Sequence, residues 1–157
     1  WKQFGQQNNV PISTQPLSKV KEKFDVVIAY QVLEHVKDPM DFIALLTNRL
    51  QPGGILHLEL PNHQSLTAKM RKISPFISDE YGFIQPPMHL RAYKKRTLQH
   101  LITQLNMETK LITVFANNHP IWGQVRNWNM FQHLLYFISG TLGMGSLLVG
   151  LAQKVNT

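Results

Sequence analysis

The sequence predicts one α/β domain built on a mostly parallel sheet. The run FDVVIAY at Phe24–Tyr30 is rich in β-branched residues and lacks polar alternation, as in a strand buried on both faces. A helical apolar stripe follows at 39–50, and a second apolar run at Ile55–Pro61 ends at a proline. Strand, helix and strand in this order form a βαβ unit, whose crossover is right-handed in nearly all proteins.

The helix predicted at 39–50 has clear start and stop signals. Asp38 is a suitable N-cap, and Pro39 suits the first helical position because that position needs no backbone N–H. We expect the turn Pro52–Gly54 to end the helix. Its apolar face consists of Phe42, Leu45, Leu46 and Leu50.

Downstream of the second strand, residues 62–92 are polar and too long for a plain connection, so we expect a lid or substrate insertion there. The stretch 127–153 contains no Asp, Glu, Lys or Arg, but glycines interrupt it, so at most a peripheral membrane contact is expected. The elements predicted after the insertion are a helix at 93–106, a strand at 107–118, a partly helical segment at 128–140 and a last strand at 146–155.

Composition limits the classes of partner. The chain has 157 residues, 43% of them hydrophobic and 16% charged, as in a globular protein. An excess of 16 Lys and Arg over 9 Asp and Glu suits an anionic partner, but the basic residues are scattered, so we do not expect nucleic acid binding. The sequence has no cysteine, which excludes disulfides and Cys-ligated zinc and fits a reducing compartment such as the cytoplasm.

Three stretches, taken in order, resemble the class I S-adenosylmethionine-dependent methyltransferases, in particular the ubiquinone-type and small-molecule branch. They are FDVVIAYQVLEHVKDP (24–39), LQPGGILHLELPN (50–62) and HLRAYKKRTLQHLITQLNMETKLI (89–112). The resemblance covers nearly the whole chain. It implies a Rossmann-like fold, S-adenosylmethionine as the cofactor, and methyl transfer to a small-molecule acceptor. The basic net charge and the apolar, aromatic stretch around Trp122, Trp128 and Phe131 would admit an anionic or lipid-like acceptor.

The sequence departs from the family before Phe24. The family's glycine-rich cofactor loop and the acidic end of its second strand are not present, so we expect a partial, truncated domain at 1–157 that lacks the first strand-helix-strand unit. Residues 8–13 would be the family's third strand. The isolated fragment is expected to be inactive. A rival interpretation is a non-catalytic module that binds a partner or acts as a scaffold.

The family's strand order, 3-2-1-4-5-7-6, has a further consequence. Without the first strand, Phe24–Tyr30 would be an apolar open edge of the sheet. Such an edge invites pairing with another chain. We therefore expect a homodimer or aggregation through this edge, or else that the residues are the ordered part of a longer polypeptide.

The resemblance also assigns site residues at the end of the first predicted strand. It places Tyr30, Gln31 and Val32 beside the methionine part of the cofactor, and Glu34 and His35 at the border of the reaction cavity. A purely structural alternative remains for the last two. Glu34 would then cap the coming helix or pair with a base, and the His35 imidazole would pack with its polar atoms satisfied.

A methyl transfer that needs a base has several histidine candidates. His89 ranks first because it precedes the helix at 93–106 as in the family, and an imidazole can accept a proton near neutral pH. His35 and His63 follow. No metal is expected, because the histidines show no i, i+4 pair on a helix. The expected substrate contacts are Asn62, Tyr81 and Tyr93.

Overall fold

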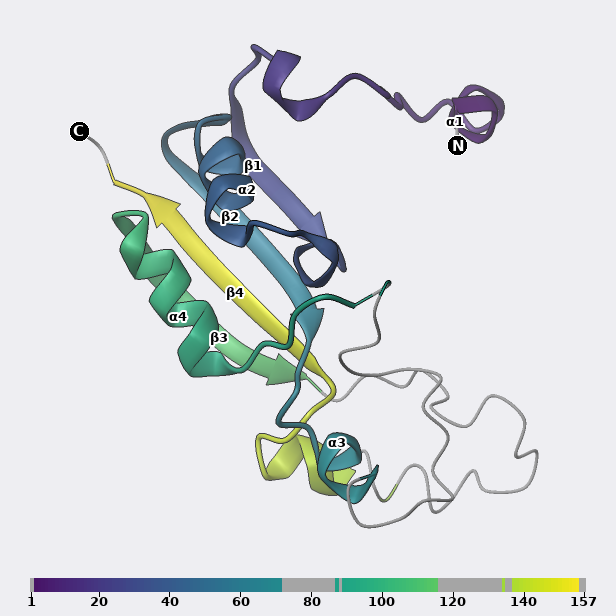
Figure 1. Ribbon diagram of the computed structural model, residues 1–157. Helices are drawn as coiled ribbons and strands as arrows, with labels where there is room; N and C mark the ends of the chain where they lie inside the picture. The colour runs from purple at the N-terminus through teal and green to yellow at the C-terminus, as the bar shows by residue number, and fades with distance from the viewer. Residues whose placement is uncertain (1, 72–86, 88, 116–133, 135–136, 156–157) are drawn as a thin grey trace.

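The fold is organised around a four-stranded sheet in the order β1-β2-β4-β3 (Figure 1). The computed structural model describes residues 2–71, 87, 89–115, 134 and 137–155. β1 and β2 are parallel, and β4 is antiparallel to both β2 and β3, so that β3 has the direction of the first pair. The strands are β1 (Phe24–Tyr30), β2 (Leu50–Pro61), β3 (Met107–Phe115) and β4 (Leu147–Lys154).

The predicted parallel pair is confirmed, but the helix between its strands ends earlier than expected. α2 spans Pro39–Thr47, and the Pro52–Gly54 turn lies inside β2 instead of ending the helix. The backbone N–H of Phe24 donates to the carbonyl of Arg49 at 2.8 Å, so the chain joins the sheet before it reaches Pro52. The turn is then accommodated as an irregularity in the β1–β2 register, with Gly53 at a φ of 74°.

The predicted N-cap of α2 is confirmed. The Asp38 carboxylate accepts hydrogen bonds from the backbone N–H groups of Met40 and Asp41 at 3.0 and 3.1 Å. This satisfies two of the amides that a helix N-terminus leaves without partners. The other helices are α1 (Lys2–Gln7), η1 (Leu17–Lys19), η2 (Leu33–His35), α3 (Leu66–Arg71) and α4 (Lys95–Gln104).

The strand predicted at 8–13 is wrong. Asn8 and Asn9 form a turn, with Asn9 at a φ of 54°, and residues 10–13 have no strand pairing. The backbone N–H of Val10 instead donates to the carbonyl of Gly5 in α1 at 2.9 Å. A strand needs a neighbour, and within the described residues the sheet ends at β1. That position confirms the expectation of an edge at Phe24–Tyr30. None of the helices in the described part has the length and apolar character needed to cross a bilayer.

The later elements follow the sequence expectations with shorter bounds. α4 and β4 confirm the helix predicted at 93–106 and the strand at 146–155. β3 confirms the strand at 107–118 as far as Phe115. In the segment 128–140, the residues described include a short helix at 137–141. The insertion at 62–92 contains α3, but residues 72–86 and 88 lie outside the described part, so its role stays a prediction.

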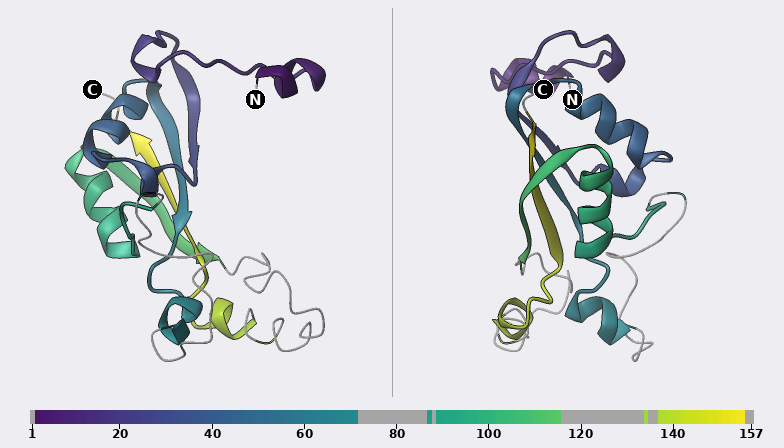
Figure 2. Two further views of the ribbon diagram at one scale, coloured as in Figure 1. Left: turned by 45° about the vertical axis from the view of Figure 1, so that its right-hand side comes forward. Right: turned by 90° about the vertical axis from the view of Figure 1, so that its left-hand side faces the viewer.

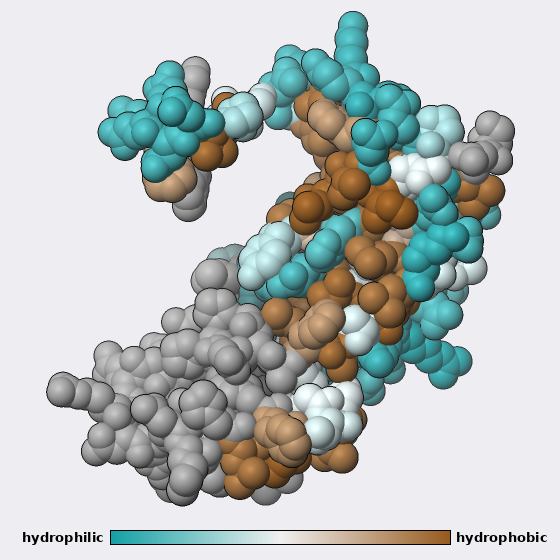
Figure 3. Space-filling view, turned by 180° about the vertical axis from the view of Figure 1, so that it is seen from behind, coloured by the Kyte–Doolittle hydropathy of each residue, from teal (hydrophilic) through white to brown (hydrophobic). Residues whose placement is uncertain are grey.

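The core lies on one face of the sheet, under α2 and α4 (Figure 2). Ile43 of α2 and Ile102 of α4 are completely buried there, as is Leu56 of β2. The opposite face keeps apolar side chains in contact with solvent: Val26 is 53% and Ile28 is 63% exposed. Figure 3 views this opposite face and shows hydrophobic residues gathered along it.

α4 packs on β4 so closely that position 150 requires glycine. A Cβ built on Gly150 would lie 2.8 Å from Cδ2 of Leu98, closer than real Cβ contacts allow. Leu98 is completely buried and cannot move into solvent. The glycine therefore sets the distance between the helix and the strand.

We expect Gly150→Ala to lower the free energy of unfolding by about 1–3 kcal/mol, because the added methyl overpacks the helix–strand interface. The measurement is urea unfolding of the protein and of the variant. The control repeats the substitution in a Leu98→Ala background, where space for the methyl exists and the cost should largely disappear. Equal costs in both backgrounds would contradict the proposed contact.

The exposed edge of β1 gives a second expectation. The 157 residues expressed by themselves should self-associate through β1, because this strand offers unpaired backbone groups and apolar side chains together. Val26→Lys with Ile28→Lys should reduce the association seen by light scattering. Leu142→Lys is the matched control, since Leu142 is 62% exposed outside the sheet. A monodisperse 18.1 kDa monomer of the unmodified chain would rule out this edge as an interface.

Candidate functional site

The candidate site begins where the chain leaves β1. The N–H of Gln31 donates to the carbonyl of Glu59 at 2.8 Å and extends the pairing of β1 with β2 by one residue. Gln31 has a φ of 52°, which turns the chain away from the sheet into η2. Leu33 then anchors this turn in the core at 1% exposure. η2 therefore lies at the carboxyl ends of two parallel strands, where open α/β sheets bind ligands.

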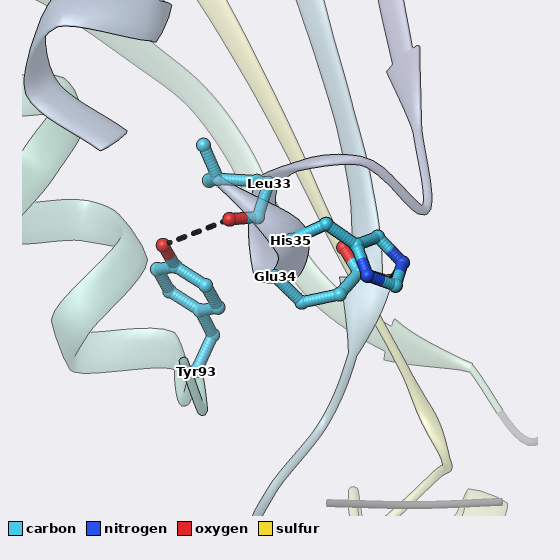
Figure 4. A network of polar contacts seen from close by, with 4 residues as sticks. All are labelled: Leu33, Glu34, His35 and Tyr93. Atoms are coloured by element: carbon cyan, nitrogen blue, oxygen red, sulfur yellow. Dashed lines mark hydrogen bonds and ion pairs between the residues drawn. The ribbon is translucent and has the colours of Figure 1, made fainter. Parts of the chain in front are cut away.

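A buried carboxylate and two imidazoles meet at this turn. Glu34 is 1% exposed, and neither of its carboxylate oxygens accepts a hydrogen bond from the residues that the structure describes. Nε2 of His35 lies 3.8 Å from Oε1 of Glu34, and Figure 4 shows the two side chains together on η2. The rings of His35 and His89 have centroids 4.9 Å apart.

The three side chains form a compact cluster with unusual electrostatics. Burial raises the pKa of the Glu34 carboxyl above its ordinary range, while an interaction with its own backbone N–H and, more weakly, the charges of His35 and His89 act in the opposite direction. An ionised carboxylate without donors is costly in a low-dielectric site. A proton on Glu34 or a positive partner beside it would remove this cost.

Backbone hydrogen bonds bring His89 to this turn from a distant part of the chain. The carbonyl of Glu34 accepts from the N–H of Leu90 at 2.8 Å and from that of Arg91 at 3.2 Å. The Arg91 guanidinium donates to the carbonyl of Lys37 at 2.6 Å. The C-terminal end of the 62–92 segment is thus fixed on η2, which the sequence alone did not indicate.

Two predicted substrate contacts have internal partners. The Tyr93 hydroxyl donates to the carbonyl of Leu33 at 3.3 Å (Figure 4), and the side chain is 2% exposed. The Asn62 amide is 3% exposed and donates to the carbonyl of Gly145 at 2.8 Å. Both side chains tie loops to the core. Tyr81 lies outside the described residues.

The predicted cofactor contacts lie at the exposed end of β1. Tyr30 is 55% and Val32 is 37% exposed, with Gln31 between them at the edge of the sheet. Their cofactor role stays a prediction. His63, a further base candidate, is not part of the Glu34, His35 and His89 cluster, and its N–H donates to the carbonyl of Tyr93 at 2.9 Å.

The buried Tyr93 gives a pH-dependent prediction. Burial raises the pKa of Tyr93 to about 12, with Arg91 lowering it and Glu34 raising it further. Because the pKa is raised in the folded state, the stability it contributes is complete below about pH 10 and is lost as the pH rises toward 12.

We expect an absorbance titration to show one tyrosine ionising near pH 12 that is missing in Tyr93→Phe. The variant should lose about 1 kcal/mol of unfolding free energy near neutral pH, because the hydrogen bond to Leu33 is removed. Between about pH 10 and pH 12, its stability should fall less than that of the unmodified protein. Identical titration curves for the two proteins would contradict the buried position of this hydroxyl.

Comparison with known proteins gives the family of this chain. Residues 3–111 match the family described as a methyltransferase domain. A tRNA U34 carboxymethyltransferase of Pseudoalteromonas atlantica is 44% identical over 50 residues, which are 32% of this chain and 15% of that protein. A ubiquinone biosynthesis O-methyltransferase of Caulobacter vibrioides is 33% identical over 79 residues, which are 45% of this chain and 31% of that protein. The matches thus span less than a third of these relatives' lengths.

The fold has close counterparts among solved structures. A crystal structure of an S-adenosylmethionine-dependent methyltransferase of Thermotoga maritima, a possible histamine N-methyltransferase, superposes with a TM-score of 0.64 at 16% identity. The superposition covers 97% of this chain and 68% of that one. These findings confirm the predicted Rossmann-like fold class. They also confirm the resemblance to the class I methyltransferases, whose cofactor is S-adenosylmethionine. The chain belongs to the methyltransferase-domain family.

Proposed function

We propose that this chain is the part of a methyltransferase that activates a small-molecule acceptor for methylation. The observation that supports the proposal is the cluster of Glu34, His35 and His89 at the carboxyl ends of β1 and β2. Ligands of open α/β sheets bind at this position, and the cluster supplies groups that exchange protons.

S-adenosylmethionine, when bound, supplies a methyl group on a positively charged sulfur. The exposed end of β1 fits one side of this cofactor, because Tyr30 and Val32 present side chains there and the strand edge presents backbone groups. The 157 residues include no glycine-rich loop before β1. They provide part of the cofactor site, and by themselves they are inactive in this proposal.

The role of the chain's own residues is to orient the acceptor and remove its proton. His89 is half-buried, its ring centroid lies 4.9 Å from that of His35, and one of its nitrogens lies within 4.8 Å of a Glu34 carboxylate oxygen. An acceptor hydroxyl held at His89 would give its proton to the imidazole, while the bound cofactor would supply the methyl group as its sulfur–carbon bond breaks and the electron pair stays on sulfur. The buried carboxylate of Glu34 then stabilises the positive imidazole charge.

The acceptor is proposed to be a small anionic or lipid-like molecule. The net charge of +7 attracts anions. The relatives suggest two classes of acceptor, because one is named as a tRNA-modifying enzyme and the other as an enzyme of ubiquinone biosynthesis. The second is favoured here, because its match is longer and because the basic residues are scattered instead of forming a phosphate-binding track.

The test is turnover of the whole protein that contains these residues. We expect release of S-adenosylhomocysteine in the presence of phenolic acids with and without a polyprenyl chain. His89→Asn should lower kcat by about 10²–10⁴-fold, because a general base is lost, and should change the KM for S-adenosylmethionine little.

His57→Asn is the matched control, since His57 also stands near a carboxylate, with Nε2 3.9 Å from Oε2 of Glu59, but lies on β2 away from the cluster. Its kcat should be unchanged. Equal kcat values for His89→Asn and the unmodified protein would contradict the role of His89. Failure of the whole protein to turn over any of these acceptors would contradict the proposed acceptor class.

A further inference from the structure

We propose that Arg91 recognises a carboxylate group on the acceptor and so determines which acceptors the site selects. The inference rests on the proposed function, because it takes the acceptor to be held at His89. Arg91 is exposed and follows His89 by two residues. Two residues span at most about 7 Å of backbone, so one small molecule can contact both side chains.

Tertiary contacts hold Arg91 at the turn after β1. Its backbone N–H donates to the carbonyl of Glu34 at 3.2 Å, and Nη2 of its guanidinium donates to the carbonyl of Lys37 at 2.6 Å. In Figure 1 the segment that leads into α4 runs past this turn. The charge is therefore fixed before a ligand arrives, and less side-chain entropy is lost when one binds.

The guanidinium keeps donors for a ligand. It has five N–H groups, and its bond to the Lys37 carbonyl is the single hydrogen bond of this group within the described residues. None of the three ion pairs in that part of the chain includes Arg91 or Lys37. A planar guanidinium can offer two parallel N–H groups to the two oxygens of a carboxylate, which fits this anion better than a lysine does.

The charges around Arg91 also favour an anion. The contact places the guanidinium at the backbone of Lys37, whose side chain is a second exposed cation. Asp38, the acidic residue next to Lys37, accepts from the first amides of α2. The Glu34 carboxyl is buried below the surface, and burial raises its pKa, which lowers its negative charge. A carboxylate at Arg91 would supply the missing counter-charge.

This local recognition differs from the general attraction of anions to a chain with a net charge of +7. Net charge acts at long range and mainly raises the rate of association, whereas a paired, directional contact raises affinity for one chemical group. The two effects separate when Arg91 is compared with another exposed arginine. Arg96, in the first turn of α4, is such a residue, and no contact of its side chain with the turn after β1 is seen.

The experiment is calorimetry on the purified whole protein that contains these residues, with S-adenosylhomocysteine present. The probes are 4-hydroxybenzoate and 4-hydroxybenzamide, which have nearly the same shape and differ in charge. We expect the acid to bind about 10–100-fold more tightly than the amide, as one hydrogen bond between charged groups predicts. Arg91→Gln should remove most of this preference.

Three variants make the ratio of the two dissociation constants decisive. If Arg91 only held its segment in place, Arg91→Gln would weaken both ligands alike and leave the ratio unchanged. Arg91→Lys keeps the charge but loses the paired donors, so its ratio should lie between those of the unmodified protein and Arg91→Gln. Arg96→Gln is the matched control, because it removes the same charge and should keep the full preference.

The outcomes separate this inference from the proposed function. Equal affinity of the unmodified protein for acid and amide, no binding of the acid, or the same ratio in Arg91→Gln and Arg96→Gln overturns the role of Arg91, even if methyl transfer to an acceptor proceeds. A preference for the acid that depends on Arg91 supports the inference even if neither ligand is methylated. That last result would instead count against the proposed acceptor class.

Discussion

The parallel pairing of β1 with β2 is the constraint on which the rest of this structure depends. Val26 to Tyr30 pair continuously with Ile55 to Glu59, and the bond from Gln31 to Glu59 extends the pairing to the start of the site. Parallel strands require a crossover, which α2 provides. Because both strands end at the same edge of the sheet, the turn after β1 and the segment after β2 meet there.

At that edge lies the buried carboxylate of Glu34, which accepts no hydrogen bond from the described residues. Leu33 and Tyr93 secure the turn through burial and one hydrogen bond, and Asp38 completes the helix start. The Glu34 carbonyl holds Leu90 and Arg91 there, but its carboxylate accepts no hydrogen bond from the described residues and is costly to bury. Buried carboxylates with shifted pKa values gather at functional sites, which is the reason for placing Glu34 in the proposed site.

The sheet has one covered and one uncovered face, and the two faces differ in what they can do. α2 and α4 bury the leucines of β2 on the covered face, where Gly150 lets α4 approach β4 closely. The uncovered face presents Val26 and Ile28 together with the unpaired edge of β1. A surface of this kind is a natural place for another chain or another segment to pack, because apolar area is still in contact with water.

The sequence by itself determined the local features: the buried-type strand at Phe24–Tyr30, the Asp38 cap, and the family order of motifs that identified the fold class. These depend on neighbouring residues. It did not determine the start of β2 at Leu50 or the lack of a strand at 8–13, because both depend on which strands are present to pair. Nor did it bring His89 to Glu34, since 54 positions separate His35 from His89. The hydrogen bonds from Leu90 and Arg91 to the Glu34 carbonyl, which hold the two segments together, form only once the chain has its tertiary structure.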